Sequence, residues 1–200
     1  VGEDGASHQC CEDFALMRSI PGMVVICPAD DVEAKQAVKA AYDYEGPVYL
    51  RFGRLAVPVF HGDDYKFEIG KGELVRQGRS VTIIANGLMV AEAIEAGNEL
   101  EICGVDAEII NIATIKPLDK ELVVASAEKT GKVITVEEHN VVGGLGEAVC
   151  AALSEECPVP VKRIGINDEF GHSGPAKDLL KQFGLSSENI VKTAKDFLSK

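Results

Sequence analysis

Hydrophobic and polar residues alternate along this chain in blocks that predict strands separated by helices. Near the start, "CCEDFALMRSI" has the pattern of a short helix that stops at a Pro-Gly pair. The apolar run "MVVICPA" predicts a buried strand, and "DDVEAKQAVKAAYDYEG" predicts a helix whose apolar face holds Ala34, Val38, Ala41 and Tyr42. With "PVYLRF" as the next strand, this part of the chain predicts a right-handed parallel crossover unit.

Residues 53–78 interrupt the rhythm. They contain a proline, the turn "HGDD" and scattered glycines, which indicates a connection between two domains. We expect this connection to finish with a strand near residues 72–77.

From residue 80 onward the alternation is regular. Strands are predicted in "SVTIIANG", "DAEIINIATI", "KVITVEEH" and "PVPVKRIGI", and Pro117 is expected to open a helix that ends at Gly131. We therefore predict an α/β protein in which residues 1–78 are the truncated end of a parallel-sheet domain plus a linker, and residues 79–200 are a complete doubly wound α/β domain. The later helices carry one-sided apolar sets: Leu145, Ala148, Val149, Ala152 and Leu153; Leu179, Leu180 and Phe183; and Ile190, Ala194, Phe197 and Leu198.

Composition narrows the class of function. Apolar residues make up 46% of the chain, enough for a core, and a formal charge of −12 argues against general nucleic-acid binding. The six cysteines form no CxxC pair, so we expect reduced thiols. No apolar run approaches the ~20 residues of a membrane span. We expect a soluble, cytoplasmic protein.

Two stretches carry candidate binding residues. "EDGASHQ" places Asp4 and His8 on one loop, where a carboxylate and an imidazole can face the crevice at the end of a parallel sheet. "YLRFGR" places Arg51 within a strand and Arg54 just past its end, where a guanidinium is well placed to bind a phosphate. Spacing alone leaves open a solvated loop in the first case and ion-paired arginines in the second.

Other motifs give weaker evidence of function. "VVGGLGE" lacks the third glycine of a dinucleotide fingerprint and the lysine of a P-loop, so we interpret its glycines as serving the turn. His139 in "EEHN" has no neighbour in the sequence that fixes a role. "GEDG" and "HGDD" lack correctly spaced further oxygen ligands, and we assign no metal site.

Four stretches resemble the transketolase family. "GEDGASHQ" resembles the transketolase loop "GEDGPTHQ", and "PADDVEAKQAVKAAYDYEGPVYLRFGR" is similar to the segment that follows it in the pyrimidine-binding domain. "ITVEEHNVVGGLGEAV" and "DEFGHSGPAKDLLKQFGLSSENIV" resemble the centre and the end of the C-terminal transketolase domain. The match runs in order over essentially the whole chain.

This resemblance implies the C-terminal portion of a thiamine-diphosphate-dependent transketolase, which moves a two-carbon ketol unit between sugar phosphates. Asp4 would hydrogen-bond a substrate hydroxyl near the reacting carbon, and His8 and Arg54 would hold the sugar phosphate, with Arg51 as a further candidate for the same anion. Residues 1–78 would then be the end of the pyrimidine-binding domain with the linker. Thiamine diphosphate and Mg²⁺ would be bound mainly outside this chain.

The resemblance also implies partners. An N-terminal transketolase section or subunit, the sugar-phosphate substrates and a second copy in a homodimer are expected, and we expect the chain to be inactive alone. Alternatives stay open: 1-deoxyxylulose-5-phosphate synthase, whose "RYPRG" resembles "RFGR"; the beta subunit of a 2-oxoacid dehydrogenase; a non-catalytic dimerisation module; or an unrelated α/β domain.

Overall fold

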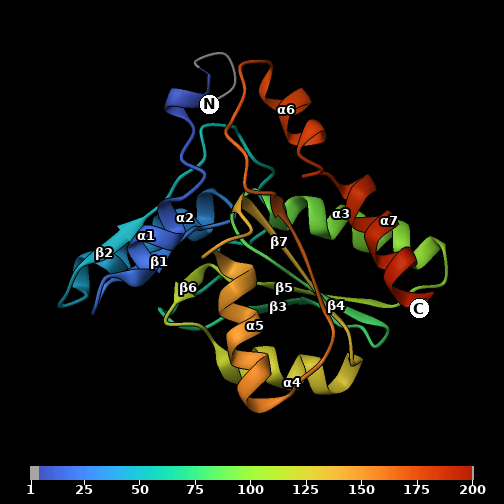
Figure 1. Ribbon diagram of the computed structural model, residues 1–200. Helices are drawn as coiled ribbons and strands as arrows, with labels where there is room; N and C mark the ends of the chain where they lie inside the picture. Colours follow the sequence, from blue (N-terminus) through green and yellow to red (C-terminus); the bar gives the residue numbers. More distant parts are fainter. Residues whose placement is uncertain (1–4, 200) are drawn as a thin grey trace.

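Two β-sheets with helices packed against them make up the protein, whose computed structural model describes residues 5–199 (Figure 1). The smaller sheet has the strand order β2-β1-β6 and the larger one β3-β5-β4-β7-β8. The strands are β1 (Val24–Ile26), β2 (Val48–Leu50), β3 (Glu73–Arg76), β4 (Val81–Ala85), β5 (Ala107–Asn111), β6 (Thr114–Lys116), β7 (Val133–Asn140) and β8 (Val161–Ile166). The helices are the short 3₁₀ helix η1 (Ala6–His8) and α1 (Asp13–Ser19), α2 (Asp31–Asp43), α3 (Met89–Ile102), α4 (Lys120–Thr130), α5 (Leu145–Glu156), α6 (Ala176–Gln182) and α7 (Ser187–Leu198).

The larger sheet is parallel except at one edge. β4 pairs in parallel with β5 and β7, β7 pairs in parallel with β8, and β3 lies antiparallel to β5. All five residues of β4 and all five of β5 are buried. Parallel strands covered on both faces need apolar residues on both, which is why these strands are mostly apolar in the sequence; Thr82, Glu108 and Asn111 are buried polar exceptions.

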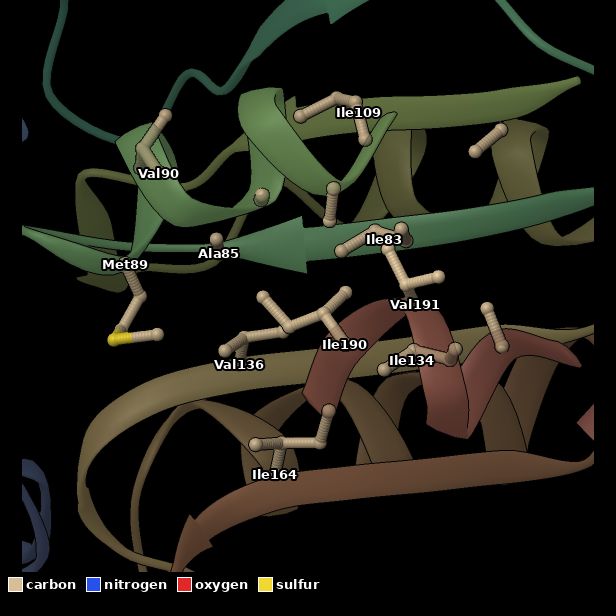
Figure 2. Close-up of a cluster of buried hydrophobic side chains, with 14 of the residues drawn as sticks. Ile83, Ala85, Met89, Val90, Ile109, Ile134, Val136, Ile164, Ile190 and Val191 are labelled. Carbon is tan, nitrogen blue, oxygen red and sulfur yellow. The ribbon is translucent and has the colours of Figure 1, made fainter. Parts of the chain in front are cut away.

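Helices cover both faces of this sheet. On one face, α3 and α7 pack over Ile83 and Ile134, and Figure 2 shows Ile190 and Val191 of α7 beside them. On the other face, α4 and α5 pack over Ile84 in a second apolar cluster. Neighbouring residues of β4 thus point to opposite layers, as a pleated strand requires. The predicted doubly wound α/β class is confirmed.

The smaller sheet takes strands from both halves of the chain. β1 pairs in parallel with β2, as the predicted crossover unit requires, and antiparallel with β6, which comes from residues 114–116. Phe14, Val25, Cys27, Ile115 and Ala148 form a small buried cluster beside it. The two sheets are therefore linked in two ways: the chain passes from β5 in the larger sheet to β6 in the smaller one, and apolar side chains pack between them.

The linker between the sheets, residues 51–72, contains no helix or strand. It is fastened by buried polar contacts. Asp30 caps α2 by accepting from the Glu33 amide at 2.9 Å, and its other oxygen accepts from the amides of Phe60 and His61 at 3.0 and 2.9 Å. The His61 ring lies between two carboxylates, with Nδ1 3.0 Å from Asp30 Oδ1 and Nε2 2.7 Å from Glu73 Oε2.

Glu33 extends this network to the larger sheet. Its carboxylate accepts from the Ala29 amide at 2.6 Å, from the Tyr65 hydroxyl at 2.5 Å and from Asn111 Nδ2 at 2.9 Å. Since Asn111 ends β5, the network ties α2, the linker and the larger sheet together. We call this set the linker clamp: Asp30, Glu33, His61, Tyr65, Glu73 and Asn111.

The clamp also corrects one prediction. The expected apolar face of α2 is wrong, because Val38 and Tyr42 are 48% and 89% exposed whereas Glu33 and Ala37 are buried. A carboxylate can be buried when several donors satisfy it, and apolar periodicity does not register such donors. The helix therefore buries Glu33, a residue of the linker clamp, and leaves Val38 and Tyr42 exposed.

Two further boundaries differ from expectation or stay open. α4 begins at Lys120, not at Pro117, because Asp119 caps it by accepting from the Leu122 amide at 3.1 Å. The division after residue 78 stays a prediction, although β3, on its N-terminal side, joins the larger sheet. All six cysteines are free. Within residues 5–199, none of the helices has the length and apolar character needed to cross a bilayer.

Candidate functional site

A cavity of about 530 Å³ lies where the N-terminal segment and the loop after β2 meet α6. Figure 1 shows the N-terminal segment and α6 at the same end of the molecule. His8, Arg51 and Arg54 line the cavity, and so do apolar residues of the α6 region such as Leu179 and Phe183. The structure thus brings three of the four predicted site residues to one cavity. The fourth, Asp4, lies outside the described residues.

The loop that carries His8 is fastened to the segment before α6. Gln9 Nε2 donates to the carbonyl of His172 at 2.8 Å. Gly5 has a φ of 80°, and a Cβ there would lie 2.5 Å from Ser173 Oγ, so a glycine is required for this close approach. The His8 side chain is exposed, and its Nδ1 lies 3.1 Å from Ser7 Oγ. The imidazole is therefore held at the cavity mouth by a loop of limited freedom.

Arg54 lies on the loop that continues from β2. The Arg51 amide donates to the carbonyl of Ile26 at 2.9 Å, which extends the β1–β2 pairing past the end of the strand. The Arg54 side chain is exposed and lines the cavity three residues later. Its position follows from the carboxyl end of a parallel strand, where α/β folds bind ligands.

Each of the three guanidinium nitrogens of Arg51 contacts an oxygen acceptor. Its Nε lies 3.2 Å from Asp13 Oδ2, its Nη1 lies 3.3 Å from Glu138 Oε2, and its Nη2 donates to the Cys10 carbonyl at 3.1 Å. The guanidinium also lies over the Phe14 ring, 4.8 Å from its centroid. Burial alone would lower the pKa of Arg51, but the neighbouring Cys27, Glu138 and Asp13 raise it. These contacts favour the ion-paired interpretation of Arg51 left open by the sequence.

Asp13 connects Arg51 to the smaller sheet. The Tyr49 hydroxyl donates to Asp13 Oδ2 at 2.8 Å, and burial together with this hydrogen bond raises the pKa of Tyr49. The other oxygen, Asp13 Oδ1, is buried with no hydrogen-bond partner among the described residues and lies 3.9 Å from His139 Nε2. Asp13 starts α1, so the wall of the cavity and this helix are tied together.

His139, to which sequence analysis assigns no role, is a buried cap of α1. Its Nε2 accepts from the amide of Phe14 at 3.1 Å, and the ring stacks on the Phe14 ring with centroids 4.8 Å apart. Its Nδ1 lies 2.6 Å from the Asn140 carbonyl and donates to it, so the imidazole is neutral. Burial lowers the pKa of His139, consistent with that form. The residue is structural.

The glycine-rich turn after β7 surrounds a carboxylate of the protein itself. Glu137 accepts from the amides of Leu145 and Gly146 at 2.6 and 2.8 Å, and burial raises its pKa to about 7. A Cβ on Gly144 would clash with Glu137 Oε2. Because the amides at the start of α5 already bind this carboxylate, the turn is not a free phosphate cradle. The interpretation that these glycines serve the turn fits the structure.

Metal ligation has no visible basis in the described part of the chain. Across residues 5–199, no three or more His, Cys, Asp or Glu side chains form a group that could hold an ion. The Cys27 thiol is also a poor candidate, because burial raises its pKa to about 12. The cavity is lined by His8, Arg51 and Arg54 and by the carboxylates of Asp13 and Glu138, both of which contact Arg51, so His8 and Arg54 are the groups that suit an anionic, oxygen-rich ligand.

Comparison with known proteins gives a consistent assignment. The family model described as "Transketolase, pyrimidine binding domain" matches residues 1–59, and "Transketolase, C-terminal domain" matches residues 70–190. An apulose-4-phosphate transketolase subunit of Phocaeicola vulgatus is 43% identical over all of the chain and 64% of its own length. A 6-deoxy-6-sulfo-D-fructose transketolase subunit of Clostridium sp. is 43% identical over 96% of the chain and 59% of its own length.

Other proteins share the same region. A 1-deoxy-D-xylulose-5-phosphate synthase of Heliobacterium modesticaldum is 40% identical over 98% of the chain but only 31% of its own length. Among solved structures, one titled "Split gene transketolase, inactive beta4 tetramer" is 45% identical with a TM-score of 0.91, and the match covers 97% of this chain and 63% of that one. The chain thus spans about three fifths of the length of these transketolase subunits. Motifs, fold and family matches agree, and the chain belongs to the transketolase family, with the family's C-terminal domain over residues 70–190.

Proposed function

We propose that this chain is the C-terminal section of a transketolase that transfers a two-carbon ketol unit between sugar phosphates. The observation that carries the proposal is that His8 and Arg54, from separate loops, line one cavity. Two groups able to carry positive charge in one cavity suit the phosphate of a sugar. In this role they bind the phosphate end of the sugar, and the energy of that binding helps to orient the other end for the reaction.

The cofactor is proposed to be bound mainly by another section. The described residues provide no metal-ligand cluster, so they do not fit a magnesium diphosphate site on their own. By its place in the family motif, Asp4 would contact a substrate hydroxyl near the reacting carbon. The proposed partners are an N-terminal transketolase section and a second copy of this chain.

The test uses this chain copurified with an N-terminal transketolase section. Ketol transfer from xylulose 5-phosphate to ribose 5-phosphate is expected from the complex and not from the chain alone. Arg54→Met should raise the KM for the phosphorylated substrates roughly 10- to 100-fold, since a hydrogen bond to a charged group contributes about 1.5–3 kcal/mol. Arg79→Met makes the same change at an exposed position before β4 and should leave KM unaltered.

Two outcomes would contradict this proposal. Transfer by the pure chain alone would show that the reacting machinery is present in it. Equal KM values for Arg54→Met and the unchanged complex would remove Arg54 from substrate binding. Light scattering of the complex after size-exclusion chromatography tests the proposed homodimer, and a single copy of each section would argue against it.

The second candidate is a 1-deoxyxylulose-5-phosphate synthase. It is favoured by the 40% identity to such an enzyme over nearly the whole chain. The same complex incubated with pyruvate and glyceraldehyde 3-phosphate distinguishes the two. Condensation of these substrates without ketol transfer would replace the transketolase proposal with the synthase.

A further inference from the structure

The Arg51 side chain joins three separate segments at the cavity wall. It contacts the carbonyl of Cys10 on the N-terminal loop, the carboxylate of Asp13 at the start of α1, and the carboxylate of Glu138 near the end of β7. These segments carry, or lie next to, the predicted phosphate-binding residues: His8 stands two residues before Cys10, and Arg54 three residues after Arg51. One guanidinium thus connects both loops of the site.

The geometry makes Arg51 a poor direct ligand for a phosphate. Its side chain is only 14% exposed, and its Nε, Nη1 and Nη2 each face an acceptor. A phosphate would have to displace the carboxylate of Glu138 or Asp13 from a charge-assisted contact in a mostly buried site. Arg51 is better suited to keeping the loops of the cavity wall in place than to binding the anion.

Glu138 fixes this arginine from the larger sheet. It lies on β7, the strand between β4 and β8, two residues past Val136, the last β7 residue paired with β4. Its side chain is 29% exposed, burial raises its pKa, and the Arg51 charge opposes that rise. A carboxylate on an internal strand of a sheet has a backbone with little freedom, so it gives the guanidinium a rigid anchor.

We propose that Arg51 and Glu138 are positioning residues for the anion-binding side of the cavity, so that the C-terminal domain contributes to substrate binding through Glu138. The inference rests on the proposed function, in which His8 and Arg54 bind the phosphate of the sugar. Arg51 fixes the distance between the two loops, and Glu138 fixes Arg51. The domain that carries neither His8 nor Arg54 thereby sets their geometry.

Charge-conserving variants test positioning without changing the field in the cavity. Arg51→Lys keeps the positive charge but loses the planar fork, and Glu138→Asp keeps the negative charge but shortens the side chain by one methylene. Each should raise the KM for xylulose 5-phosphate five- to tenfold in the complex with the N-terminal section, with kcat within twofold. The KM for an unphosphorylated ketose donor, erythrulose, should not change, which a general loss of structure would not reproduce.

The matched control is a second Arg–Glu pair. Arg76 Nη2 lies 2.9 Å from Glu101 Oε2, between β3 and α3, and neither residue lines the cavity. Glu101→Asp should leave both KM values unaltered. Glu138→Gln separates positioning from charge: positioning predicts a weaker interaction with the phosphorylated donor, whereas tighter binding would show that Glu138 competes with the anion and would overturn the proposal.

A direct measurement of phosphate binding tests this inference separately from the proposed function. The dissociation constant of inorganic phosphate for the chain itself, measured by ³¹P NMR, should rise five- to tenfold in Arg51→Lys and Glu138→Asp. If these variants bind phosphate as the unchanged chain does, the positioning role fails while the proposed function stands. If phosphate binding follows the prediction but the complex transfers no ketol unit, the proposed function fails and the positioning role stands. Absence of phosphate binding by the unchanged chain overturns both.

Discussion

The larger sheet and the junction beside the smaller sheet are held together by different physics. The larger sheet is buried between two apolar layers in which residues such as Ile83 and Ile84 contact helices on opposite faces. The junction depends instead on polar side chains whose partners are far away in the chain, with Glu33 and Arg51 as the clearest cases. Apolar packing tolerates exchange among similar residues, whereas a polar junction requires particular pairs.

The largest loss of stability should come from removing side-chain volume from the core around the larger sheet. Ile83→Ala should lower the free energy of unfolding by roughly 2–5 kcal/mol, because Ile83 is fully buried and the cavity left behind cannot collapse completely. Urea denaturation followed by circular dichroism measures the change. Ile102→Ala is the matched control, since Ile102 is 87% exposed and the same substitution should cost less than about 0.5 kcal/mol. Equal losses in the two variants would contradict the assigned core.

The next effect should come from the linker clamp. Glu33→Ala leaves the Ala29 amide, the Tyr65 hydroxyl and the Asn111 amide without their shared acceptor. We expect a loss of about 1–3 kcal/mol, the usual result of leaving buried polar groups unsatisfied. Glu128→Ala, an exposed position on α4, makes the same change and should be nearly neutral. Proteolysis of residues 51–72 should also become faster in Glu33→Ala, and an unchanged cleavage rate would argue that the clamp does not fasten the linker.

The smallest effect concerns pH. Burial by itself would lower the pKa of His61, but its hydrogen bonds to Asp30 and Glu73 outweigh burial and raise it above the ordinary value of 6.5. A raised pKa in the folded protein gives stability that is fully present below pH 6.5 and is lost as pH rises through the folded value. The melting temperature of the unchanged protein should therefore fall as pH rises above 6.5, and more steeply than that of His61→Gln.

Burial also raises the pKa of Glu33 and of Glu138, so the comparison with His61→Gln isolates the contribution of His61. Glu137, whose pKa is raised to about 7, loses its contribution mainly between pH 4.5 and 7. His139, whose pKa is lowered, loses its contribution only as pH falls below its ordinary range. Parallel melting profiles for the unchanged protein and His61→Gln above pH 7 would show that His61 is not charged between the two carboxylates.

The same contrast explains what could be predicted from the sequence. Most helices and strands of the larger sheet follow from apolar periodicity, and the five predicted apolar residues of α5, from Leu145 to Leu153, are all buried. The single strand predicted in "DAEIINIATI" is wrong, because it is divided into β5 and β6, which join different sheets. The resemblance in four ordered motifs correctly indicated the transketolase family. It also predicted that His8 and Arg54 act together, and the structure places both on one cavity.

The polar junction could not be predicted because its partners are distant in the chain. Nothing near Glu33 in the sequence indicates Tyr65 or Asn111, so apolar periodicity predicts that the helix buries Val38 instead. The sequence does contain one signal of buried polar contacts: the strand that starts with Val133 and Ile134 continues into Glu137 and His139, and polar residues at buried strand positions imply specific partners. The same reasoning applies to Arg51 at the end of β2.

β6 has a consequence for how the protein can be divided. It follows β5 along the chain, yet it completes the sheet formed by β1 and β2. Residues 79–200 expressed alone would present β6 without its neighbour, and residues 1–78 expressed alone would leave one side of β1 without hydrogen bonds. Unpaired strand edges promote self-association. The position that divides the two halves in the sequence is therefore a poor place to cut the molecule, and the halves should be produced and refolded together.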